Sequence, residues 1–154
     1  MKTRNVLLVL LMFLGLGALA GGGMLIISPS GKLIGMPLEM LVKSPFKSFL
    51  LPGIILFTIL GVAPCLLIFA LMKKPVCTFA ERINLFKDMH WAWTFSIYVA
   101  FGLIGWLQAE MMFIQAVHWL HAFYMLFALI IIFVTLLPGV RNLYKKTAVQ
   151  LLAG

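Results

Sequence analysis

The sequence predicts an all-α membrane protein, a polytopic bundle of four transmembrane helices that forms one domain over residues 1–154. Apolar residues make up 64% of the chain and charged residues 10%, whereas a soluble domain has about 45–50% apolar and about 25% charged residues. A chain with so few polar side chains cannot cover itself, so its surroundings must be lipid. The longest apolar stretch, 91–140, is about twice the roughly 20 residues that one span needs, and its only charged residue is Glu110. It therefore predicts two consecutive spans.

Residues 6–27 form the first predicted span. A basic start, an apolar run and small residues also resemble a cleavable signal peptide, but the apolar run continues beyond the small residues, which favours a retained helix. Gly17 and Gly21 have the GxxxG spacing, and Ala18 and Gly22 repeat it one residue later. Such faces let two helices approach closely. We expect this face to pack within the same bundle rather than against a second copy.

Residues 28–48 connect the first two spans and are expected to lie on the membrane surface as an interfacial segment. Pro29 and Gly31 are typical of a turn, and Pro37 predicts the start of a short helix over 38–42. A lid over a binding site is the functional alternative. The sequence favours the simpler interpretation, an interfacial connector.

The second predicted span covers 49–72. Pro64 lies well inside it and removes a backbone hydrogen bond, which predicts a kink near Gly61. The polar loop 73–90 follows, and the spacing of its apolar residues predicts a short amphipathic helix over 78–87.

The third and fourth predicted spans cover about 91–113 and 119–137. Trp91 marks the entry of the third span, because indole rings settle at the membrane interface. Pro138 and Gly139 are expected to end the fourth span. Small residues four apart on the third span predict close helix packing, at Ala92, Ser96, Ala100, Gly105 and Ala109.

The basic residues predict the orientation of the bundle. Nine of the twelve Lys and Arg residues lie on one side, in the N-terminal residues, the 73–90 loop and the C-terminal residues. The other three lie in 28–48. Because loops rich in Lys and Arg stay in the cytoplasm, both termini are expected there, in a multi-pass protein of the bacterial inner membrane.

The candidate ligand-binding residues are Glu110, Gln115, His118 and His121, close to the turn between the last two spans. An ionisable residue in a span is a candidate functional site by default. Glu110 lies about 12 Å beyond the middle of its span, at 1.5 Å per residue, so it reaches the outer edge of the hydrocarbon. A structural ion pair with a lysine of 28–48 is therefore the alternative that needs no chemistry.

One carboxylate and two imidazoles are also a donor set for zinc or iron, or for a proton relay. The chain has no HExxH motif and no further carboxylate nearby, and His90 lies on the opposite side of the membrane. The sequence thus predicts no metal site and no bound cofactor, with a metal ion or a quinone as a lesser alternative.

Several function classes are disfavoured. The chain has no nucleophile elbow, phosphate-binding loop or dinucleotide fingerprint, so no catalytic residue is assigned. No separate basic patch with interleaved aromatic residues suggests nucleic-acid binding, and Cys65 and Cys77 do not suggest a disulfide framework. Positions in the middle of the spans are nearly all apolar, which disfavours an ion pore.

Short motifs in residues 14–72 resemble small bacterial four-helix membrane proteins. They are Gly21-Gly22-Gly23, Ser28-Pro29-Ser30-Gly31, Gly35-Met36-Pro37, Ser44-Pro45-Phe46 and Leu51-Pro52-Gly53. The pattern is similar to the DoxX-like group, in which a first helix and a periplasmic segment lead into a second helix that starts with Pro and Gly. The resemblance implies an inner-membrane four-helix bundle, an accessory subunit near respiratory or quinone chemistry. It assigns no functional residue.

Three functions follow as expectations. The first is a non-catalytic accessory or scaffolding subunit, with membrane lipids and a membrane-protein partner or a second copy as its partners. The second is a protein or enzyme that binds a lipid or a quinone-like molecule at the outer end of the bundle. The third is a small proton-coupled transporter that depends on Glu110.

Overall fold

Four long helices form the bundle, as the sequence predicts. The structure is a computed structural model and describes residues 3–147. The first span is α1 (Thr3–Ile27); the second, Leu50–Lys73, consists of α2 (Leu50–Ile55), η3 (Leu56–Val62) and α3 (Ala63–Lys73); the third is α5 (Trp91–Ile114) and the fourth is α6 (Trp119–Leu136). All four are long and apolar enough to cross a membrane. Shorter helices connect them: η1 (Lys32–Ile34), η2 (Leu38–Leu41), α4 (Thr78–Arg82) and α7 (Pro138–Tyr144).

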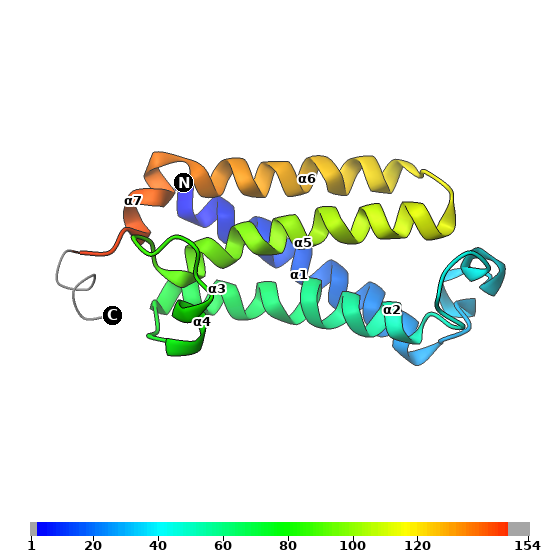
Figure 1. Ribbon diagram of the computed structural model, residues 1–154. Helices are drawn as coiled ribbons and strands as arrows, with labels where there is room; N and C mark the ends of the chain where they lie inside the picture. The colour runs from blue at the N-terminus through cyan, green and yellow to red at the C-terminus, as the bar shows by residue number, and fades with distance from the viewer. Residues whose placement is uncertain (1–2, 148–154) are drawn as a thin grey trace.

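The bundle has two distinct ends (Figure 1). We call the end with the start of α1, the 74–90 loop and α7 the terminal end. We call the other the hairpin end, which comprises residues 28–48 and the turn 115–118 between α5 and α6. The predicted helix after Pro37 is confirmed as the 3-10 helix η2.

The fourth span ends just before Pro138, as predicted: α6 stops at Leu136, and Pro138 lies in the first turn of the separate helix α7, where its missing N–H costs nothing. One predicted boundary, in the loop 73–90, is wrong. The helix expected over 78–87 ends at Arg82, and the backbone then turns so that the amide side chain of Asn84 can bond the loop. Local hydrogen bonds of this kind compete with helix formation at Asn.

Pro64 acts on the second span through a π-helix. The preceding segment, η3, has π-helical hydrogen bonding, and Pro64 then lies in the first turn of α3. A proline inside a regular helix leaves a carbonyl one turn earlier without its partner, and a π-helical segment changes the hydrogen-bond register at that point. The irregular hydrogen bonding covers the seven residues of η3, which include Gly61, and the kink expected there stays a prediction.

Glycines bring α1 into close contact with the second span. A Cβ on Gly22 would lie 2.7 Å from the backbone nitrogen of Phe57, and a Cβ on Gly53 would lie 2.7 Å from the Cβ of Leu25. The expected packing within the bundle is therefore confirmed for the face that contains Gly22. Gly17 faces α6 instead, with the hydroxyl of Tyr124 3.5 Å from its Cβ position.

The core is densest toward the terminal end. Leu7 and Leu11 of α1, Leu71 of α3 and Ile131 of α6 are fully buried. The indole N–H of Trp93 donates to a carbonyl of α6, at Thr135, over 2.8 Å. Large apolar side chains on the outer faces are exposed, among them Leu66, Phe69, Leu126 and Phe133. Outer faces of this kind suit contact with lipid.

Candidate functional site

Residues 28–48 fold over the hairpin end of the bundle. Leu41 and Phe49 are buried in a cluster with Leu25 of α1. The ring of Phe46 meets the ring of Phe113 on α5 edge-on, with centroids 5.9 Å apart. The segment is therefore packed onto two spans, and a simple connector is an incomplete description of it.

Two cavities lie beneath this segment. The larger, about 540 Å³, is an open cavity lined by α1, η3, α5, α6 and residues 34–40. The smaller, about 300 Å³, lies between α2, α5 and residues 36–49. Both volumes are in the range of small-molecule sites. The two cavities share five lining residues, namely Met36, Leu56, Trp106, Glu110 and Ile114.

Glu110 and His121 form the polar centre of the larger cavity. Carboxylate oxygen Oε2 of Glu110 lies 3.8 Å from Nε2 of His121. The imidazole is 8% exposed and the carboxylate side chain 31% exposed, so both are mostly removed from solvent. His118 lines the same cavity. Three of the four candidate residues thus come together.

Gln115 is the exception. It ends α5 in a left-handed conformation with φ 52°. Its side-chain oxygen accepts a hydrogen bond from Nζ of Lys43, and it lines neither cavity. Gln115 therefore ties the 28–48 segment to the turn between α5 and α6.

The partner of the Glu110 carboxylate differs from the lysine of 28–48 that the structural alternative expected. Within residues 3–147, its carboxylate lies beside the imidazole of His121 on α6, and no lysine of the 28–48 segment forms a salt bridge with it. Lys43 of that segment bonds to Gln115 instead. The carboxylate thus faces the cavity with an imidazole beside it.

The described part of the chain holds no group of three or more His, Cys, Asp or Glu side chains arranged to bind a metal ion. His121 is engaged elsewhere, because its Nδ1 accepts a hydrogen bond from the backbone N–H of His118 over 2.9 Å. This contact caps the start of α6. It leaves Nε2 as the ring nitrogen that faces Glu110.

The small-residue face of α5 divides into two parts. Ala92, Ser96 and Ala100 are fully buried, so the expected close packing is confirmed there. At Gly105, packing is absent, since an added Cβ would meet no atom within 4 Å. Gly105 and Ala109 line the smaller cavity instead.

Two aromatic residues that line the cavities were not among the candidates predicted from the sequence. Trp106 lines both cavities and Tyr124 lines the larger one. Trp106 lies one helical turn before Glu110 on α5, so the i, i+4 spacing is a signal that could have found it. Tyr124 follows His121 by about one turn of α6, but this spacing becomes a signal only once the start of that helix is known.

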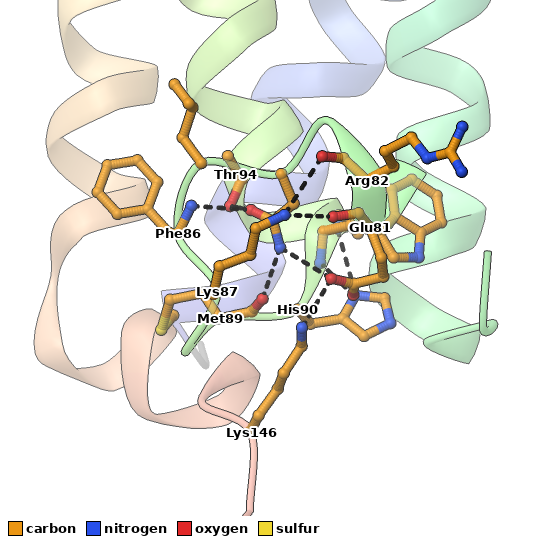
Figure 2. A network of polar contacts seen from close by, with 12 residues as sticks. Glu81, Arg82, Phe86, Lys87, Met89, His90, Thr94 and Lys146 are labelled. Atoms are coloured by element: carbon orange, nitrogen blue, oxygen red, sulfur yellow. Dashed lines mark hydrogen bonds and ion pairs between the residues drawn. The ribbon is translucent and has the colours of Figure 1, made fainter. Parts of the chain in front are cut away.

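A second polar cluster lies at the terminal end around Asn84, and Figure 2 shows its members Glu81, Phe86, Met89 and Thr94 as labelled sticks. The amide of Asn84 donates to the backbone oxygen of Met89 over 2.8 Å and to Glu81 over 3.1 Å. Its oxygen accepts from the hydroxyl of Thr94 over 2.6 Å and from the N–H of Phe86 over 3.1 Å. Asn84 is only 1% exposed, so these four bonds account for its whole amide group.

Glu81 joins this cluster to the C-terminal part of the chain. Nζ of Lys146 lies 2.6 Å from Oε2 of Glu81, and the N–H of Trp91 donates to Oε1 over 3.3 Å. Burial alone would raise the pKa of the Glu81 carboxyl, but the hydrogen bonds from Lys146, Asn84 and Trp91 lower the pKa below its usual value. The carboxylate is therefore held in its charged form.

His90 has a structural role at the same end. Its Nδ1 accepts from the N–H of Ala92 over 3.2 Å and caps α5. Burial, only partly opposed by the charge of Glu81, lowers the pKa of His90. Its backbone N–H donates to Tyr144, whose hydroxyl in turn donates to the carbonyl of Leu71 over 2.8 Å. Residues 148–154 lie outside the described residues.

The fold and the two ends define the class of protein: an all-α four-helix bundle with four candidate membrane spans, as in a multi-pass membrane protein. No family model, curated protein or solved structure matches this chain. Its function is therefore argued from its own side chains.

Proposed function

We propose that this protein binds one apolar or amphipathic small molecule, such as a lipid-like compound, at the hairpin end of the bundle. One observation carries the proposal: the 540 Å³ cavity places a carboxylate and two imidazoles, from Glu110, His118 and His121, among apolar walls. Ligand sites are typically concave and apolar with a few convergent polar groups. The walls suit a hydrocarbon part and the polar centre suits a head group.

The glycines favour this function over a scaffolding role. Gly22 and Gly53 pack at the contact between α1 and the second span, so they are not available to a partner helix. Gly17, Gly21 and Gly105 line the cavities, where the absence of a side chain leaves room. The small residues that suggested a helix–helix interface in the sequence are thus better explained as leaving space for a ligand.

Native mass spectrometry of the protein, extracted gently from its own membrane, tests the proposal. We expect a defined small molecule on a single chain, and we expect it to be lost in Gly17→Leu, which fills the larger cavity. Ala20→Leu is the matched control, because Ala20 is exposed on the same helix and lines neither cavity. A chain that carries no small molecule but a second protein at fixed stoichiometry would support the accessory-subunit function instead.

We propose further that the protein lies in a bacterial inner membrane with both termini in the cytoplasm. The resemblance to small bacterial membrane proteins supports the membrane, and the excess of Lys and Arg at the terminal end supports the orientation. Labelling intact cells with a membrane-impermeant thiol reagent tests this. A cysteine at position 32, made by Lys32→Cys in a Cys77→Ser background, should react from outside, and Cys77 of the unaltered chain should not.

A further inference from the structure

The hydrogen bonds of His121 determine which of its ring nitrogens carries a proton. Nδ1 accepts the backbone N–H of His118 over 2.9 Å, so Nδ1 must offer a lone pair. A neutral imidazole has one donor and one acceptor nitrogen. Nε2 is therefore the N–H donor, and it points toward the carboxylate of Glu110.

The donor and the carboxylate do not satisfy each other. Nε2 of His121 and Oε2 of Glu110 are 3.8 Å apart, whereas an N–H···O hydrogen bond spans about 2.7–3.2 Å. Contacts of this length call for a third polar atom between the two groups. An oxygen at roughly 2.8 Å from each would lie to one side of the line that joins them. Because both residues line the larger cavity, that position is open to a ligand.

We propose that the ligand carries a hydroxyl group, as a long-chain or polycyclic alcohol does, and that this hydroxyl bridges His121 and Glu110. This inference rests on the proposed function. The hydroxyl oxygen accepts the Nε2–H of His121, and its own hydrogen is donated to Glu110. An ether or a ketone has no hydrogen to donate, and a carboxylate or a phosphate is repelled by Glu110, so none of these head groups makes both bonds.

The surroundings fit a neutral alcohol. Apart from Glu110, the lining residues of the larger cavity with hydrogen-bonding side chains are Trp106, His118, His121 and Tyr124. Lys43 of the covering segment is bonded to Gln115 and does not compensate the carboxylate. The remaining wall is apolar, with Leu56, Leu60 and Leu103 among its members. Such walls favour a hydrocarbon body by removing its surface from water.

Competition among four probes of equal chain length tests the inference. Purified protein in detergent is incubated with dodecanol, dodecyl methyl ether, the corresponding methyl ketone and dodecanoate, and the bound probe is identified by native mass spectrometry. We expect dodecanol to bind about tenfold or more tighter than the other three, since one hydrogen bond to a charged group distinguishes it. Glu110→Gln should reduce this preference, whereas Gln108→Leu, which alters an exposed residue of the same helix outside both cavities, should keep it.

Each other result has one meaning. Equal binding of all four probes would overturn the hydroxyl bridge and leave the proposed function standing, with a water molecule between the two side chains. Tightest binding of the ketone would also overturn the bridge, because two donors would then face the ligand. If none of the four probes binds, and no molecule is retained from the native membrane, the proposed function fails together with the inference.

Discussion

The two ends of this bundle treat polar groups in opposite ways. At the terminal end, the amide of Asn84 makes four hydrogen bonds and the carboxylate of Glu81 is held by Lys146 and its neighbours. At the hairpin end, Glu110 and His121 face each other across 3.8 Å beside a cavity of about 540 Å³. At the terminal end the polar groups bond one another, whereas at the hairpin end they remain available to a ligand.

This difference separates a structural site from a candidate binding site. A buried polar network whose members are all bonded rigidifies a fold, because each unmade bond would carry a desolvation penalty. A carboxylate beside an open, apolar space has no such role, and its unfilled bonds suit a ligand. Charge content alone does not distinguish them, since both ends contain a glutamate and at least one histidine.

The largest expected effect is at the terminal end. Asn84→Ala should lower the free energy of unfolding by about 3 kcal/mol or more, because it leaves the buried Thr94 hydroxyl and the Met89 carbonyl without their partner. Thermal unfolding in detergent, followed by circular dichroism, measures the change. Asn142→Ala is the matched control, since Asn142 is exposed on α7 at the same end, and it should change stability by less than about 0.5 kcal/mol. Equal stability of the two variants would show that the network does not hold the end together.

A pair of glycine substitutions sharpens the contrast between packed and open surfaces. Gly22→Ala should destabilise the protein by about 1–3 kcal/mol, because its Cβ would lie 2.7 Å from the backbone of Phe57. Gly105→Ala should be neutral or stabilising by up to about 1 kcal/mol, since its Cβ meets open space and alanine favours the helix. The same unfolding measurement compares them. A destabilised Gly105→Ala variant would mean that the wall of the smaller cavity is closed.

The smallest of these effects is the dependence of stability on pH at Glu81. Its pKa is lowered in the folded protein, so its contribution is fully present above the ordinary glutamate pKa of about 4.3 and is lost as the pH falls through the lowered value. Wild-type protein should therefore lose stability on acidification more steeply than Glu81→Gln. Unfolding curves recorded between about pH 3 and pH 7 give the difference. Identical pH dependence in the two proteins would contradict a role for this carboxylate.

The sequence predicts the helices well because span length and hydropathy are local properties. All four spans fall close to their expected positions, and the first helix extends back to Thr3. The same local view fails at residues 83–87, where helical spacing of apolar residues is overridden by the hydrogen bonds of Asn84. A periodic pattern of apolar residues does not reveal a side chain that bonds backbone groups in place of helical hydrogen bonds.

The candidate site was predictable only in part. Glu110, His118 and His121 lie near one turn, so their convergence follows from the hairpin. Gln115 lies in the same stretch, but its left-handed backbone directs it to Lys43, 72 residues away in the chain. The pairing of Glu81 with Lys146 joins residues 65 apart, and such contacts arise only from the packing of whole helices.

The contacts of residues 144–146 also have a consequence for biosynthesis. Tyr144 bonds Leu71 and His90, and Lys146 bonds Glu81 and the backbone oxygen of Asp88. These residues leave the ribosome after all four spans have been made, so the helices enter the membrane before the terminal end can close. A polypeptide that stops shortly before Tyr144 would contain every span but lack the hydrogen bonds that close the terminal end. Such a fragment is therefore a natural substrate for membrane proteases.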